Sequence, residues 1–311
     1  MSAILSHMAI EDTIQTSVKT DNTLLGILWM TLAGLLFVGV TGVVRYIGTS
    51  IPPIEAAFIR YLFGILLLIP LILRLKPKWP TGKKLALFSA RGIAHAIAVS
   101  LWFFAMARIP ITEVIAIGYT APIYVTIGAA LFLGERLRLF RVLAVIAGFI
   151  GMLVILRPGF QPLQTGAIAQ LISAPVFAAS FIMAKVLTRD EKPIIIVVML
   201  SIFCTAALAP GAWLQWQTPS VSDSLWLALV ALLATLGHFA QTSAYQAAPI
   251  TATQPVWFMQ LVWGALLGWF AFGEAVDPFV VIGAGIIISA VTYISHREAK
   301  AAKRLKSLKS M

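Results

Sequence analysis

Long apolar stretches separated by short polar segments run along nearly the whole chain. They do not alternate apolar and polar positions, so the pattern predicts helices and not the strands of a membrane barrel. A helix of about 20 residues crosses the hydrocarbon core of a bilayer. Windows of that length predict ten spans, at residues 24–46, 53–73, 84–107, 110–132, 139–156, 166–187, 193–214, 225–246, 250–272 and 277–295.

The composition agrees with this pattern and excludes a soluble protein. Hydrophobic residues make up 60% of the 311 residues and charged residues 11%, against roughly 25% charged residues in soluble domains. Backbone groups in hydrocarbon must be paired within the chain, as they are in helices. The single cysteine, Cys204, lies in an apolar run and cannot form an internal disulfide. We therefore expect an all-α integral membrane protein.

The net charge of +11 does not indicate nucleic-acid binding, because the basic residues are sorted by membrane side. With the N-terminus in the cytoplasm, 18 of the 23 Lys and Arg residues fall on the inner side. The others lie at outer helix ends or within spans: Arg45, Arg108, Arg157, Arg60 and Arg91. Cytoplasmic loops carry an excess of positive charge. The pattern predicts a multi-pass plasma-membrane protein (inner membrane in a Gram-negative bacterium) with both termini cytoplasmic.

The chain repeats itself when it is shifted by 139 or 140 residues. At 140, Arg45 meets Lys185; at 139, the Pro-Ile-Thr stretch at 110–112 meets the same stretch at 249–251. Each half contains five spans, so the second half enters the membrane from the opposite side. We predict two inverted five-helix repeats around a central cavity, a plan that recurs in secondary transporters. The alternative is that the duplication only builds a stable bundle.

The chain is predicted to consist of four segments. They are a polar N-terminal tail without a signal-peptide core, the two repeats and a basic tail: 1–23, 24–159, 160–295 and 296–311.

With this layout the chain resembles the drug/metabolite transporter superfamily, in its EamA-type branch. Three motifs carry the resemblance: Ala-Arg-Ile-Pro-Ile-Thr at 107–112, Leu-Gly-Glu-Arg at 133–136 and Arg-Pro-Gly at 157–159. The second half departs from it, because Ala275 follows Gly273-Glu274 and no Arg-Pro-Gly follows the last span. The resemblance implies a transported metabolite and a cavity between the halves, lined mainly by the first, third and fourth helices of each.

Ionisable side chains inside spans are costly and usually face a cavity or a partner. Arg91 and His95 are four residues apart and share a helical face, and their counterparts in the other half are Val230 and Ala234. We hypothesise that Arg91 attracts an anionic or electron-rich substrate group and that His95 hydrogen-bonds it. Alternatively, Arg91 extends to the membrane interface and His95 bonds a neighbouring helix.

Further polar and aromatic positions are candidates for the cavity wall. One face of the predicted eighth span carries polar residues at helical spacing, and the ninth carries a similar set. Aromatic side chains there could stack a planar solute, although packing against lipid or neighbouring helices is the ordinary role. The predicted substrate-binding set besides Arg91 and His95 is Trp102, Tyr119, His238, Gln241, Tyr245, Gln254, Trp257 and Gln260.

Two cations and two carboxylates fall at the outer ends of their helices: Arg45, Glu55, Arg108 and Glu113. They suggest an outer gate of ion pairs that break on opening, with ordinary interfacial charges as the alternative. Arg60 lies more than one turn deeper than Glu55 and could pair with a carboxylate.

The sequence does not indicate an enzyme. Two of the four histidines lie in the tails, and there is no HExxH motif, Asp-rich box or Gly-rich phosphate loop. We expect no metal or cofactor. The prediction is a secondary transporter that moves a small organic metabolite (an amino acid, vitamin or nucleotide-like cofactor) across the lipid bilayer by alternating access. The alternatives are a solute channel and, against the absence of such motifs, a membrane-embedded enzyme.

Overall fold

The computed structural model describes residues 22–76, 78–109, 111–118, 120–134, 139–156 and 164–273, together with parts of 278–296. All regular elements of these residues are α-helices. The first half contains α2 (Thr23–Ile47), α3 (Pro53–Leu75), α4 (Gly82–Met106), α5 (Ile111–Gly118), α6 (Thr120–Leu133) and α7 (Leu139–Leu156). The second half contains α8 (Thr165–Leu187), α9 (Pro193–Leu214), α10 (Val221–Ala247), α11 (Ile250–Trp257) and α12 (Met259–Phe272).

Seven of the described helices are long and apolar enough to cross a membrane. They are α2, α3, α4, α8, α9, α10 and the Pro255–Phe272 segment, with shorter apolar helices at Val142–Gly151 and Val281–Ala290. The chain is therefore a multi-pass membrane protein. The predicted fourth span is divided between α5 and α6, and the predicted ninth between α11 and α12. The count of ten spans stays a prediction.

The break between α11 and α12 lies at Phe258, three residues after Pro255. Proline lacks the backbone N–H that the helix ladder needs. Around the break, Phe258 N donates to Pro255 O at 3.3 Å and Leu261 N to Phe258 O at 3.1 Å, which are the tighter bonds of a 3₁₀ turn. Proline does not end a helix everywhere in this chain, because α3, α8 and α9 continue through a proline: Pro70, Pro175 and Pro210.

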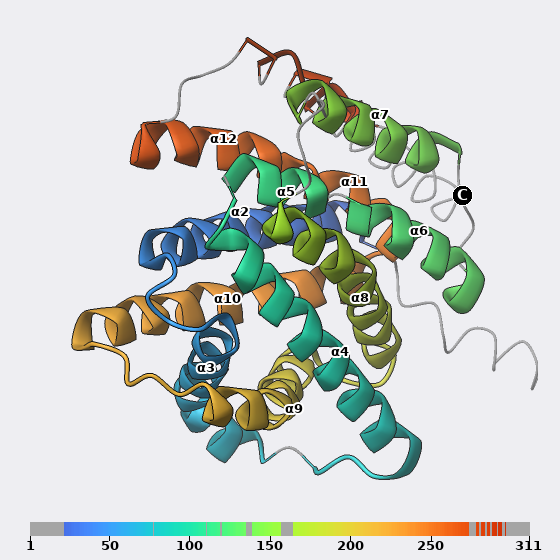
Figure 1. Cartoon of the computed structure of the whole chain (residues 1–311). Coiled ribbons are helices and arrows are strands. Elements are labelled where there is room, and N and C mark those ends of the chain that lie inside the picture. The colour runs from blue at the N-terminus through green and yellow to red at the C-terminus, as the bar shows by residue number, and fades with distance from the viewer. Residues whose placement is uncertain are drawn as a thin grey trace, which may run out of the picture.

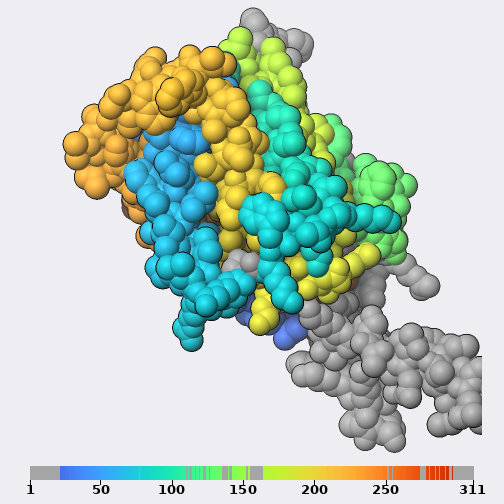
Figure 2. Space-filling model, turned by 90° about the horizontal axis from the view of Figure 1, so that it is seen from below, coloured from blue at the N-terminus to red at the C-terminus, as the bar shows by residue number. Residues whose placement is uncertain are grey.

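The two halves pack against each other in reciprocal pairs (Figure 1). The first helix of one half, α2, packs along the third helix of the other, α10; likewise α8 packs along α4. The two second helices, α3 and α9, pack together, and Figure 2 views the molecule from the side where α3, α4 and α9 are neighbours. If the two halves are exchanged, the pair α2 with α10 becomes the pair α8 with α4, and the pair α3 with α9 is unchanged. A two-fold relation between two repeats has this property.

Small residues at the helix crossings allow this close packing. A Cβ on Gly26 would lie 2.5 Å from Ala248 Cβ, and one on Gly92 would lie 2.5 Å from Phe203 Cβ. Large apolar side chains cover the outside instead, among them Leu131, Phe132, Trp213 and Phe270, each more than 70% exposed. So much exposed apolar surface is suited to contact with lipid.

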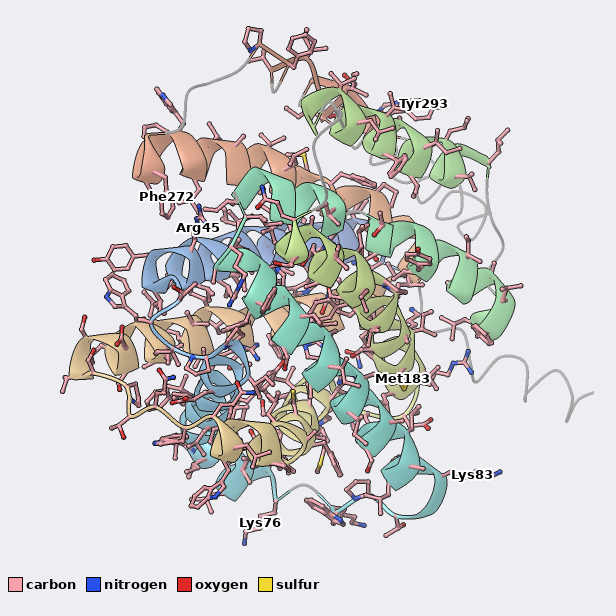
Figure 3. The ribbon with its side chains drawn as sticks, viewed as in Figure 1. Arg45, Lys76, Lys83, Met183, Phe272 and Tyr293 are labelled. Carbon is pink, nitrogen blue, oxygen red and sulfur yellow. The ribbon has the colours of Figure 1, made fainter. Side chains whose placement is uncertain are left out.

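Positively charged side chains lie near the ends of several helices. Figure 3 shows Arg45 close to Phe272, at the last turns of α2 and α12, whereas Lys76 and Lys83 lie apart from each other along the lower edge of the view. Lys76 directly follows α3 and Lys83 is in the first turn of α4. Because α2 and α3 follow each other as antiparallel helices, these two groups lie at opposite ends of the bundle.

Candidate functional site

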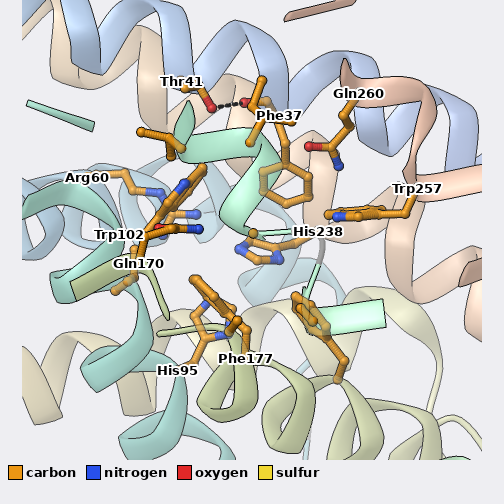
Figure 4. Close-up of a pocket in the computed structure, with 17 residues that line it drawn as sticks. Phe37, Thr41, Arg60, His95, Trp102, Gln170, Phe177, His238, Trp257 and Gln260 are labelled. Carbon is orange, nitrogen blue, oxygen red and sulfur yellow. Dashed lines mark hydrogen bonds between the residues drawn. The ribbon is translucent and has the colours of Figure 1, made fainter. Parts of the chain in front are cut away.

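A cavity lies between the two halves (Figure 4). Its volume is about 80 Å³, and a cavity needs roughly 10–15 Å³ to hold one water molecule. First, third and fourth helices of both halves contribute to the wall, as the resemblance implied, and α3 contributes Arg60 in addition. The lining residues are Phe37, Thr41, Arg60, His95, Val99, Trp102, Val114, Ile115, Gly118, Ala121, Gln170, Ala174, Phe177, Phe181, His238, Trp257 and Gln260.

Five aromatic side chains of the wall form a closed ring of contacts. Phe37 on α2 lies 6.4 Å from Trp102 on α4, and Trp102 lies 6.0 Å from Phe177 on α8 (centroid distances). Phe177 and Phe181 stack at 5.6 Å with 12° between their planes. Phe181 then contacts Trp257 at 6.2 Å, and Trp257 returns to Phe37 at 5.8 Å. The ring therefore draws on both halves.

Two histidines face each other within this ring. The imidazoles of His95 on α4 and His238 on α10 have centroids 5.0 Å apart, and both side chains are almost fully buried. His95 Nδ1 lies 3.0 Å from the Ser180 hydroxyl. His238 Nδ1 has no hydrogen-bond partner among the described residues. An imidazole with a free nitrogen beside a cavity can donate to or accept from a polar solute.

The remaining polar groups of the wall are a cation, two amides and a hydroxyl. Arg60 is 3% exposed. Gln170 Oε1 lies 3.4 Å from the Ser173 hydroxyl, whereas Gln260 Nε2 lacks a partner in the described part of the chain. The Thr41 hydroxyl donates to Phe37 O at 2.9 Å and is used within its own helix. No Asp or Glu is among the described lining residues.

The structure brings five predicted substrate-binding residues together at the cavity wall: His95, Trp102, His238, Trp257 and Gln260. Three others are buried outside that wall: Arg91, Gln241 and Tyr245. Arg91 Nη1 donates to Ile196 O at 3.1 Å, which joins α4 to α9. Tyr119 and the Gln254 side chain lie outside the described residues. The binding role of each of these residues stays a prediction.

The wall residues that sequence reasoning did not select include Phe37, Gln170, Phe177 and Phe181. One signal was available, because Phe37 and Phe177 are 140 residues apart and so occupy equivalent places in the two repeats. A large aromatic residue kept in both copies is a candidate for the shared interface. Arg60 was noted as a buried cation, but no carboxylate among the described residues pairs with it.

Three of the four residues of the predicted outer gate contact backbone groups in this structure. Arg45 Nη1 donates to Ile109 O at 3.2 Å, and Arg108 Nη1 donates to Phe104 O at 3.1 Å. Glu55 Oε2 accepts from Gln217 N at 2.9 Å, while the Glu113 side chain lies outside the described residues. The gate of ion pairs therefore stays a prediction.

The contact of Arg45 has a counterpart in the other half. Lys185, its repeat equivalent, donates through Nζ to Tyr245 O and Ala248 O, each at 2.6 Å. Ala248 follows Ile109 by 139 residues, so each half uses a cation at the end of its first helix to bind carbonyls at the end of its third. We call these two contacts the Arg45 clasp and the Lys185 clasp.

The fold and the cavity define a multi-pass membrane protein with an aromatic-walled space between two related halves. The model of the EamA-like transporter family matches the chain twice, over residues 24–157 and 164–296. The chain belongs to this family. It is a membrane transporter, and its family membership argues against an enzyme.

The curated relatives that match the chain are transporters of small metabolites. A riboflavin transporter of Rhizobium johnstonii is 32% identical over 93% of this chain and 98% of its own length. A riboflavin transporter of Vibrio cholerae is 30% identical, with coverages of 91% and 97%. An S-adenosylmethionine uptake transporter of Rickettsia bellii is 27% identical, with coverages of 83% and 88%. These relatives support a small-metabolite transporter.

A solved crystal structure matches the fold with a TM-score of 0.67. It covers 88% of this chain and 97% of its own, at 20% sequence identity. At that identity the likeness concerns the arrangement of the helices alone.

Proposed function

We propose that this transporter carries a planar aromatic metabolite of the flavin class by alternating access. The observation that carries the proposal is the closed ring of five aromatic side chains around the cavity. Aromatic faces stack on planar rings, and each such contact contributes about 0.5–1.5 kcal/mol beyond its buried area. Two full-length relatives named riboflavin transporters support the same substrate class.

The polar groups of the wall suit the edge of such a ring. His238 has an unpartnered nitrogen and Gln260 an unpartnered amide within the described residues. Amides and imidazoles can donate to and accept from the carbonyl and nitrogen groups of a heterocycle. Burying these groups without a partner costs free energy, and a bound heterocycle would supply the missing hydrogen bonds. The aromatic side chains would thus provide affinity for the solute, and the polar groups would fix its orientation.

Alternating access requires contacts between the halves that can be exchanged. Glu55 at the start of α3 accepts from Gln217 N, before α10. Lys84 at the start of α4 forms a 2.7 Å ion pair with Glu191, before α9. Since α3 and α4 run antiparallel, these contacts lie at opposite ends of the bundle. Each side chain of the Lys84–Glu191 pair is partly exposed, and exposed pairs contribute only about 0–1 kcal/mol. Such contacts can break and re-form as the halves move.

Transport by purified protein in liposomes tests the proposal. We expect saturable uptake of labelled riboflavin, and accelerated uptake when the vesicles are preloaded with unlabelled riboflavin, because a carrier exchanges its substrate. Protein-free vesicles provide the background. Flux that rises linearly with concentration and shows no counterflow would indicate a channel. Saturable flux of other metabolites without any riboflavin flux would reject the flavin class.

A further inference from the structure

Arg60 is a buried cation in the cavity wall, and none of the described residues pairs with it as a partner of opposite charge. Its side chain is 3% exposed, and Figure 4 shows it extending toward Trp102 at the cavity. The guanidinium carbon lies 3.8 Å from the centre of the Tyr61 ring. Its Nε and Nη1 have no hydrogen-bond partner in the part of the chain that the structure describes. Two donor nitrogens therefore remain unsatisfied next to empty space.

The surroundings of Arg60 do not balance its charge. Its titratable neighbours in the described wall are His95 and His238, and no carboxylate lines the cavity among these residues. The ion pair of the described residues, Lys84 with Glu191, is at the start of α4 and not at the cavity. An unpaired buried charge is costly, and in membrane proteins such charges mark the path of a substrate.

We propose that Arg60 binds an anionic or carbonyl-rich edge of the transported solute, so that the cavity selects planar anions over planar cations. A guanidinium presents its donors in a rigid planar fork that fits two oxygens side by side. Such an edge would satisfy the free donors, while the aromatic ring holds the body of the solute. The inference deepens the proposed function, on which it rests for the planar shape of the solute. It also adds Arg60, on the second helix of the first half, to the residues proposed to contact the solute.

Binding of three probes that share one ring tests the charge preference. The probes are 2-naphthoate, 2-naphthamide and 2-naphthylmethylammonium, which carry an anionic, a neutral and a cationic head group. Calorimetry on the purified full-length protein would measure their Kd values. We expect wild type to bind the acid at least about tenfold more tightly than the ammonium. In Arg60→Met the two affinities should become nearly equal.

Two further variants make the test specific. Arg74→Met removes an exposed arginine from the same helix, so it should keep the wild-type ratio of affinities. Arg60→Lys should keep a reduced preference for the acid, because the lysine ammonium retains the charge but not the planar fork.

Unliganded Arg60→Met should melt no earlier than wild type, because it loses an uncompensated buried charge. An arginine needed only for packing would lower the melting temperature when replaced.

The proposal is overturned if wild type binds the acid no better than the ammonium, or binds neither. It is also overturned if Arg60→Met keeps the full preference for the acid. Since these measurements use synthetic probes, they do not depend on riboflavin transport. A protein that shows the charge preference but no riboflavin flux would reject the flavin class and retain the role of Arg60.

Discussion

Phe37 and Phe177 occupy equivalent places in the two repeats and supply one aromatic face each to the cavity. Each makes three ring contacts, and those of Phe177 are with the His95 imidazole at 5.1 Å, Trp102 at 6.0 Å and Phe181 at 5.6 Å. Phe177 therefore connects the aromatic ring to the histidine pair. A side chain in that position would contribute to solute affinity while the helices around it keep their packing.

We expect Phe177→Leu to raise the KM for the aromatic substrate roughly threefold to tenfold, because it loses stacking contacts of about 0.5–1.5 kcal/mol. The maximal rate should change less, since leucine still fills most of the space. Saturation kinetics of uptake in liposomes measure both values. Phe270→Leu is the matched control, because Phe270 is 76% exposed on the outer surface and should leave the KM unchanged. An unaltered KM in Phe177→Leu would show that the ring does not contact the solute.

Charge was one of the properties that made single residues predictable from the sequence. His95 and His238 were selected because ionisable groups in apolar spans are costly, and both line the cavity. Arg91 gave the same signal, yet it lies behind the wall and bonds to Ile196 O. Phe177 was not selected, because an apolar ring is not distinctive among 18 phenylalanines and only its match to Phe37 in the other repeat marks it. Periodicity tells which residues share a helical face, but not which face meets the other half.

At the scale of helices, each of the two clasps joins the end of the first helix of a half to the end of the third helix of the same half. Arg45 binds Ile109 O in the turn that follows α4, and Lys185 binds Tyr245 O and Ala248 O at the end of α10. The last carbonyls of a helix have no partner within the helix and carry partial negative charge. Each cation therefore stabilises the turn between the third helix of its half and the fourth, which is divided into two shorter helices.

We expect Lys185→Met to lower the free energy of unfolding by about 1–3 kcal/mol, because two charge-assisted hydrogen bonds to a helix end are lost. Arg45→Met should cost less, since Arg45 makes one longer bond. Thermal unfolding of the purified variants would rank them. Lys192→Met serves as the control, because Lys192 is exposed. Equal melting temperatures for Lys185→Met and the control would show that the clasp does not stabilise the fold.

Helix positions were predictable because hydrocarbon demands long apolar segments with paired backbone groups. The predicted spans 53–73 and 193–214 correspond to α3 and α9 within a few residues. Helix continuity was harder to predict. Pro255 lies next to a break, whereas Pro210 lies inside an uninterrupted helix. The same side chain permits both outcomes, and the packing around it decides between them.

At the scale of the whole molecule, the reciprocal packing of the halves is the feature that links fold to transport. The pairs α2 with α10 and α8 with α4 place the first and third helices of opposite halves side by side. The cavity then lies where the halves meet. Two equivalent halves can adopt each other's arrangement, and such an exchange would open the cavity to one side and then to the other.

Labelling of single introduced cysteines would test the inverted arrangement. The single native cysteine, Cys204, is fully buried, so it should give little background. Thr81 lies between α3 and α4, and Thr218 lies in the equivalent loop between α9 and α10; both are exposed. The first loop is flanked by Lys76, Lys78 and Lys83, while 215–220 contains no Lys or Arg.

Because positive charge favours the cytoplasmic side, we expect Thr81→Cys to be protected from an impermeant maleimide in intact cells and labelled after permeabilisation. Thr218→Cys should react in intact cells. An odd number of spans between equivalent loops places them on opposite sides, whereas an even number places them together. Labelling of both cysteines from the same side would therefore contradict two inverted halves. It would also remove the symmetry argument for alternating access, in which each of two inverted halves adopts the arrangement of the other.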